Sequence, residues 1–188
     1  MSRYAVMTHK VFPLIPFQSE QNTNLVSSAS FLWKEEGILE LNYVFRIEGG
    51  KDQLDVLIPV SNSSPQRRDE LSASTCFEAF ISIPKYPSYW ELNISPNSDW
   101  NLYFFEGYRH GVSAIKDVQN PLINMQVAPR HFQCNVLLNL NPWWPFNQTP
   151  ELSLAAILEQ PNSVFTHWAL CHPGVSPDFH DRRSFVAP

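Results

Sequence analysis

A chain of 188 residues is long enough to bury one sizeable core, and nothing in its pattern marks a second, so we expect a single domain over residues 1–188. The formal net charge is −5 and the basic residues lie in short groups such as Arg67-Arg68, which excludes nucleic acid and anionic membranes as expected partners. Charged residues make up only 16% of the chain, against about 25% in an average globular protein. This composition, with 13% aromatic residues, favours an all-β protein with large apolar sheet faces.

The cysteines and the N-terminal segment predict the compartment. Cys76, Cys134 and Cys171 are widely spaced and form no CxxC pair, which indicates free thiols and a reducing environment. The apolar run near the start is interrupted by Pro13 and Pro16, so it is too short for a signal sequence or a membrane span. We therefore expect a cytoplasmic protein.

The first third of the chain predicts a hairpin followed by a short strand. Residues 25–33 and 38–48 are strand-like runs on either side of a polar turn at 34–37, where Gly37 ends the corner. Residues 54–60 predict a further short strand. Residues 66–74 are charged and predict a loop with at most one helical turn.

The middle third, residues 75–111, predicts three consecutive strands joined by two turns. Apolar and mixed residues alternate with a period of two in each strand, which is the mark of a pleated strand with one buried face. If the strands pair as an antiparallel meander, their second faces merge into one surface. The polar residues of that surface are Glu78, Glu91, Asn93, Asn101 and Tyr103.

The last third predicts three more strands, at residues 132–140, 152–159 and 164–170, and a proline-rich tail from residue 172 onward. Between the first two of these strands, residues 141–150 predict a loop that carries Trp143 and Trp144. About nine strand-like runs with no convincing amphipathic helix predict an antiparallel β-sandwich.

Several motifs in this order resemble the DOMON-like bacterial proteins that are related to family-nine carbohydrate-binding modules. They are the runs at residues 75–78, 89–96, 99–101, 107–109, 168–170, 172–173 and 177–180. The resemblance covers nearly the whole chain and implies a jelly-roll type of antiparallel β-sandwich that binds a sugar or haem on one sheet face. Haem-binding relatives use a Met and a His as axial ligands, and Met1, Met7 and Met125 lie outside the central meander, so we expect no cofactor.

Sugar recognition requires an aromatic ring over the C–H face of the sugar and a few polar groups for its hydroxyls. Carboxylates and amides would bond the hydroxyls, an arginine would donate in a fork, and an aromatic ring would stack. The leading hypothesis is a non-catalytic module that binds a small polar ligand, with a saccharide as the expected class. The residues predicted to bind it are Glu78, Glu91, Asn93, Tyr103, Arg109 and Trp168.

Other interpretations stay open at this point. Glu78, Glu91 and Arg109 can equally form a structural ion-pair network, because a buried charge must be paired with or without a ligand. Two carboxylates on neighbouring strands also suit a glycoside hydrolase, although any chain of this size supplies two glutamates by chance. An interaction domain that docks a protein partner through Trp143 and Trp144 is the alternative from another class.

The last cluster of polar residues, His172, Asp178 and His180, has the residue types of a metal site or a proton relay. Its intervals are loose and no further ligand follows from the spacing. A structural role in the tail is favoured, and no metal is expected.

Overall fold

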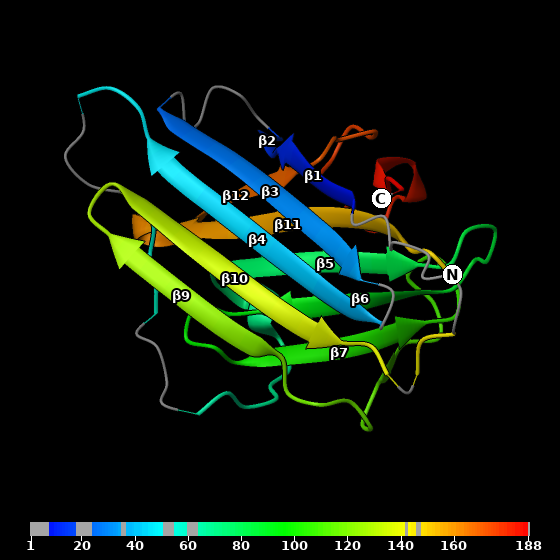
Figure 1. Cartoon of the computed structure of the whole chain (residues 1–188). Helices are drawn as coiled ribbons and strands as arrows, with labels where there is room; N and C mark the ends of the chain where they lie inside the picture. The colour runs from blue at the N-terminus through cyan, green and yellow to red at the C-terminus, as the bar shows by residue number, and fades with distance from the viewer. Residues whose placement is uncertain are drawn as a thin grey trace.

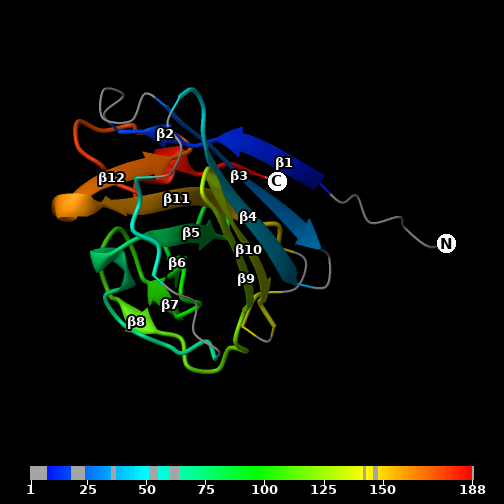
Figure 2. The same cartoon turned by 90° about the vertical axis from the view of Figure 1, so that its left-hand side faces the viewer.

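The computed structural model describes residues 8–17, 24–34, 37–50, 55–59, 64–141, 143–145 and 148–187. In these ranges the chain forms two antiparallel sheets packed face to face, a β-sandwich (Figures 1 and 2). One sheet has five strands in the order β1-β3-β4-β10-β9, and the other has seven in the order β2-β12-β11-β5-β6-β7-β8.

The five-stranded sheet is built from two hairpins and one further strand at its edge. Its strands are β1 (Thr8–Pro13), β3 (Leu25–Lys34), β4 (Ile38–Ile47), β9 (Leu122–Ala128) and β10 (His131–Asn139). Gly37 opens β4 at a φ of 75°, a left-handed conformation that glycine adopts without a Cβ clash. Alternate residues of β4 and β10 are buried, so one face of this sheet lies on the core and the other faces solvent.

The seven-stranded sheet holds the central meander. Its strands are β2 (Ile15–Pro16), β5 (Cys76–Ser82), β6 (Tyr89–Ile94), β7 (Trp100–Phe105), β8 (Ser113–Ala114), β11 (Glu151–Gln160) and β12 (Val164–Ala169). Every residue of β5 and β6 is buried, on both faces of the sheet. The inner face packs on the five-stranded sheet, so something other than that sheet must cover the outer face.

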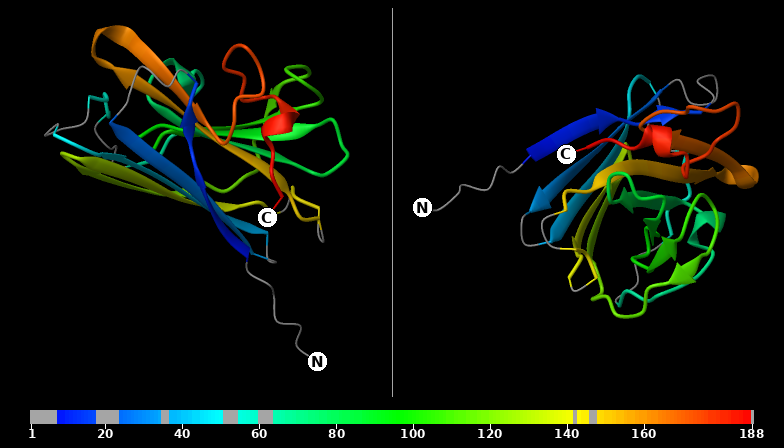
Figure 3. Two further views of the ribbon diagram at one scale, coloured as in Figure 1. Left: turned by 90° about the horizontal axis from the view of Figure 1, so that it is seen from above. Right: turned by 90° about the vertical axis from the view of Figure 1, so that its right-hand side faces the viewer.

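The C-terminal segment provides much of that cover, as Figure 3 shows in red. Val186 forms a bridge with Leu152 of β11, and the Ser184 hydroxyl lies 3.0 Å from the Ser153 hydroxyl. Phe179 packs on the outer side of Phe80. The tail therefore closes part of the outer face and brings residues 178–180 to the central meander.

The core between the sheets is rich in aromatic residues. Tyr43 of β4 is fully buried, and its hydroxyl donates to the Glu78 carbonyl of β5 over 2.7 Å. This hydrogen bond joins the two sheets directly at the position of a predicted site residue. The Trp90 ring contacts those of Trp143 and Trp144 at one end of the same core.

The structure confirms most of the predicted strands. The hairpin, the three strands of the meander and the three later strands all form, and residues 66–74 are a loop with one 3₁₀ turn at Leu71–Ala73. Residues 55–59, the described part of the strand predicted at 54–60, form no strand. The Leu57 amide of this segment donates to the Glu159 carbonyl of β11. The prediction placed no strand at β1 or β9, and both are edge strands of the five-stranded sheet.

Two further 3₁₀ turns, at Pro161–Ser163 and Arg182–Ser184, complete the regular structure of the described ranges. None of the helices in these ranges is long and apolar enough to cross a membrane.

Candidate functional site

The pairing of β5, β6 and β7 places five predicted polar residues on one face, the outer face of the seven-stranded sheet. Two rows run across the three strands, Glu78–Asn93–Asn101 and Phe80–Glu91–Tyr103. We call this surface, made of Glu78, Glu91, Asn93, Asn101 and Tyr103, the polar face. The register therefore brings together residues that lie up to 25 positions apart in the sequence.

Glu78 has an unusual environment for a carboxyl group. Its residue is only 3% exposed, and no donor among the described residues forms a hydrogen bond with its carboxyl oxygens. Burial and the neighbouring Glu91 raise the pKa of Glu78 well above its usual value, while the charge of Arg109 opposes the rise. The Glu78 carboxyl group is thus nearly buried and has no hydrogen-bond partner among the described residues, although its oxygens are not fully sealed from solvent.

Glu91 lies beside it and is better satisfied. Its Oε1 accepts a hydrogen bond from Asn93 Nδ2 over 2.8 Å, and its Oε2 lies 3.8 Å from His180 Nε2. Burial raises the pKa of Glu91 as well, against the hydrogen bond from Asn93 and the charge of Arg109. The two carboxyl groups of the polar face therefore both resist ionisation.

Asp69, on the loop before the meander, organises the side of the polar face that lies on β7. Its Oδ1 accepts from Tyr103 Oη over 2.6 Å and from Asn101 Nδ2 over 2.9 Å. Burial, together with the hydrogen bond to Asp69, raises the pKa of Tyr103 further above its already high value. Tyr103 is only partly buried, so its ring lies at the rim of the polar face.

Arg109 approaches the polar face from the loop after β7 and not from a strand. Its backbone adopts a φ of 51°, and its amide donates to the Tyr89 hydroxyl over 3.1 Å. The guanidinium forms an ion pair with Asp178 of the tail, with Nη2 2.8 Å from Oδ1. Half of the side chain is exposed, so Arg109 forms a second part of the rim and acts on the two carboxyl groups through its charge.

His180 belongs to this site although the sequence favoured a structural role for it. Its Nδ1 lies 2.7 Å from the Tyr89 hydroxyl, and its ring meets the edges of Phe80 and Phe105. Burial and the charge of Arg109 lower the pKa of His180 to about 4, so the imidazole is neutral near pH 7. The motif at residues 177–180 was the only sequence signal for this placement.

Trp168 is the one predicted site residue that the structure separates from the others. It is 1% exposed and lies on the inner face of β12, where its Nε1 donates to Thr166 Oγ1 and its ring meets Phe45. The expectation that it stacks on a ligand at the polar face is therefore wrong. The period-two pattern of β12 gave no means to choose between the two faces.

The geometry disfavours the other interpretations of the sequence, namely a protein-docking loop, a glycoside hydrolase and a metal site. Trp144 is 4% exposed and Trp143 is half-buried, and both pack on Trp90, so these two indoles do not present a broad aromatic surface. Glu78 and Glu91 are both buried, which is not the open cleft that a glycosidic substrate requires. Within the described residues, no three His, Cys, Asp or Glu side chains gather in a group that could hold a metal ion.

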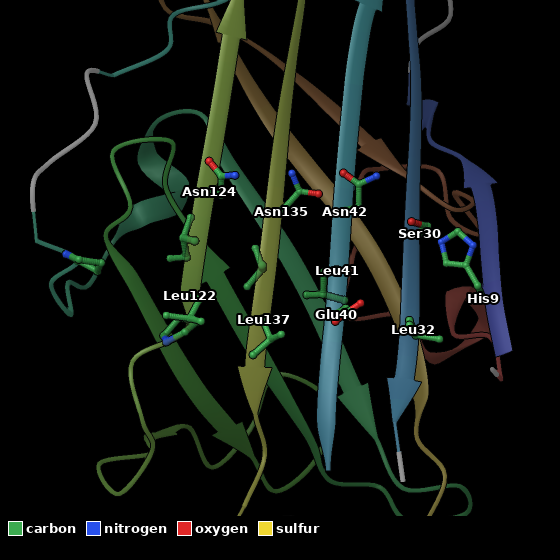
Figure 4. A pocket seen from close by; sticks show the side chains of 14 residues that line it. His9, Ser30, Leu32, Glu40, Leu41, Asn42, Leu122, Asn124, Asn135 and Leu137 are labelled. Atoms are coloured by element: carbon green, nitrogen blue, oxygen red, sulfur yellow. The ribbon is translucent and has the colours of Figure 1, made fainter. Parts of the chain in front are cut away.

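A second feature, which the sequence analysis did not single out, lies on the solvent side of the five-stranded sheet. It is a groove of about 470 Å³ whose floor carries two rows of side chains (Figure 4). One row is polar and the other is mostly leucine, and we call the whole the amide groove. The polar row is Ser30, Asn42, Asn135 and Asn124, and the second row is Leu32, Glu40, Leu137 and Leu122.

No protein-family model matches the sequence, and no curated protein matches it. Among solved structures, a Bacteroides uniformis protein described as a candidate carbohydrate-binding protein aligns with a TM-score of 0.62 at 9% identity, over 95% of this chain and 84% of that one. A family 9 carbohydrate-binding module of Caldicellulosiruptor kristjanssonii, solved with glucose, aligns with a TM-score of 0.44 at 15% identity, over 86% and 73% of the two chains. The same module solved with cellotriose gives the same score over 72% of its length. The first alignment shows that this chain shares its β-sandwich fold with a protein of known structure.

Proposed function

We propose that this chain is a non-catalytic module that binds a saccharide at the polar face of its seven-stranded sheet. The Bacteroides uniformis protein with the same fold is described as a candidate carbohydrate-binding protein, which is consistent with the proposal. The residues proposed to contact the ligand are Glu78, Glu91, Asn93, Tyr103 and Arg109. Trp168 is no longer among them, because it lies in the core.

The observation that carries the proposal is the carboxyl group of Glu78, which is nearly buried and has no hydrogen-bond partner among the described residues. Such an acceptor loses most of its contact with water without gaining a protein donor, and a structural ion-pair network would have given it one. Arg109, the predicted partner, is instead bound to Asp178. A ligand with several hydroxyl groups would supply the missing donors to Glu78 and to the free lone pairs of Glu91.

The distribution of exposure indicates how a ligand would approach. Tyr103 and Arg109 are the accessible members of the set, whereas Glu78, Glu91 and Asn93 are buried. A sugar ring would place its hydroxyls on the buried carboxyl and amide groups and present a C–H face to Tyr103. The depth of the carboxyl groups suits one terminal sugar unit more than the middle of a long chain.

The experiment is a glycan-array screen of the purified protein, followed by calorimetry on the saccharides that bind. Hydrogen bonds between neutral groups contribute about 0.5–1.5 kcal/mol each, so Glu78→Gln is expected to weaken binding by roughly two- to tenfold. We expect Arg109→Ala to weaken it by about tenfold. The matched control is Arg46→Ala, since Arg46 is an exposed arginine that pairs with Glu48 on the other sheet.

Two results would contradict the proposal. One is a screen in which no saccharide binds the wild-type protein. The other is a saccharide whose affinity is the same for the wild type, Glu78→Gln and Arg109→Ala.

A further inference from the structure

The amide groove is a separate feature from the polar face, on the opposite sheet. Asn42, Asn135 and Asn124 come from β4, β10 and β9 and are direct neighbours in the register, and Ser30 of β3 extends the row. Because neighbouring strands are about 4.8 Å apart, the four residues span roughly 14 Å. Figure 4 shows them in line across the sheet, with the leucine row beside them.

The hydrogen bonds that Gln133 donates determine which side-chain groups of the amide groove remain available to a ligand. Gln133 Nε2 donates to Asn42 Oδ1 over 3.0 Å and to Asn135 Oδ1 over 3.2 Å. Both asparagines therefore keep their Nδ2 groups unpaired among the described residues, and Asn124 has no side-chain partner there. Gln133 thus orients a pair of amide donors beside the third, exposed amide of Asn124.

The charge of the groove excludes several classes of ligand. Among the described residues that line it, the ionisable side chains are His9 and Glu40, and Glu40 forms an ion pair with Lys34 outside the lining. None of the described lining residues is an arginine or a lysine, so these residues supply no clamp for a phosphate, sulfate or uronate group. Amides and a hydroxyl both donate and accept, which suits hydroxyl groups.

The leucine row supplies the other half of the recognition. Leu137 and Leu32 are half-buried, and Leu122 at the edge of the sheet is 71% exposed. Together they offer an apolar strip parallel to the row of amides. A ligand that matches both rows needs hydroxyl groups along one side and C–H surface along the other, over a length greater than one sugar ring.

We propose that the amide groove is a second binding site, for an extended neutral oligosaccharide, that works independently of the polar face. The proposal depends on the two rows of side chains and the volume of about 470 Å³, which lies in the range of ordinary ligand sites. An extended neutral peptide is the alternative occupant, and the test includes it.

The experiment follows the side-chain amide signals and the leucine methyl signals of the full chain by NMR. The probes are cellohexaose, mannohexaose, laminarihexaose and xylohexaose, with hexagalacturonic acid as the charged comparison and a neutral Gly-Asn repeat peptide as the alternative. We expect at least one neutral hexasaccharide to shift the signals of Asn42, Asn135 and Leu137, and hexagalacturonic acid to leave them unchanged.

Variants identify the site. Asn135→Ala is expected to lower the affinity for that hexasaccharide by about tenfold, because it removes one of the two amide groups that Gln133 orients. The control is Gln126→Ala, an exposed amide of β9 outside the groove, which should bind as the wild type does. The same titration in Glu78→Gln separates the two proposals, because loss of the polar face leaves groove binding intact.

The proposal is overturned if no neutral hexasaccharide shifts the groove signals, if only the peptide does, or if hexagalacturonic acid binds as well as the neutral chains. It is also overturned if Asn135→Ala and Gln126→Ala bind equally. Folding of each variant is checked by its amide spectrum, and Asn42→Ala replaces Asn135→Ala should that variant fail to fold.

Discussion

Glu78 shows how a single side chain connects stability with binding. In the folded chain its carboxyl group is buried, next to a second carboxyl group, and without a hydrogen-bond donor among the described residues. Those features raise the free energy of the ionised form in the folded state, so the Glu78 carboxyl group does not stabilise the fold. A residue that destabilises the folded state at neutral pH and lies on a partly closed face is typical of a binding site.

This environment predicts how stability depends on pH. The pKa of Glu78 is raised on folding, so between its unfolded value of about 4.5 and its folded value the folded state binds more protons than the unfolded state. The free energy of unfolding therefore falls as the pH rises through that window. Glu91, whose pKa is also raised, contributes a fall of the same sign.

Glu78→Gln removes one of the two titrations and keeps the shape of the side chain. We expect urea unfolding to show that the variant loses less stability than the wild type between pH 4 and pH 8. Glu106→Gln, a change at an exposed carboxylate on the loop after β7, is the control and should follow the wild type. Parallel pH profiles for Glu78→Gln and the wild type would contradict the raised pKa.

At the scale of elements, the meander β5–β7 was the most predictable part of the fold. One face of each strand is apolar and the other mixed, so the sequence alone assigned Glu78, Glu91, Asn93 and Tyr103 to one face, and the register confirms this. β9 was less predictable because it is an edge strand with apolar Leu122 and Val127 exposed, and prolines precede and follow it. Its absence from the prediction hid the amide groove, which needs Asn124.

The inter-sheet hydrogen bond is the element-scale contact that supports the polar face from below. Tyr43 of β4 donates to the backbone carbonyl of Glu78, so it links the strand that carries this carboxyl group to the opposite sheet. Tyr43→Phe removes the donor and leaves the ring, and we expect a loss of about 1 kcal/mol in the free energy of unfolding.

Tyr86→Phe is the matched control, because Tyr86 is 59% exposed and its hydroxyl makes no hydrogen bond in the described part of the chain. Chemical denaturation of the two variants and the wild type at one pH measures the difference. Equal stability of all three proteins would show that the hydroxyl of Tyr43 contributes nothing to the association of the sheets.

At the scale of the whole molecule, the C-terminal tail makes contacts with the polar face that the sequence could not predict. Asp178 holds Arg109 and His180 meets Tyr89, so segments about 70 to 90 residues apart in the sequence complete one side of the polar face. Long-range closure of this kind leaves no periodic signal in either segment. The same limit applies to Trp168, whose strand could be placed but whose face could not.

The sandwich thus carries a candidate site on each outer face. The polar face is mostly buried, contains two carboxyl groups, and is partly covered by the tail, whereas the amide groove lies on the solvent side of the five-stranded sheet and has no arginine or lysine among its described lining residues. These properties suit a terminal sugar unit and an extended neutral chain, respectively. A single module with both sites would hold a glycan at two points.

The measurement that tests the central claim most directly is the carbon-13 NMR spectrum of the glutamate carboxyl groups during titration with a saccharide that binds. Assignments come from Glu78→Gln and Glu91→Gln, which each remove one signal. We predict that the signals of Glu78 and Glu91 move together in proportion to the bound fraction while that of Glu106 stays fixed. Saturation with a bound saccharide that leaves the signals of Glu78 and Glu91 unmoved would contradict the account.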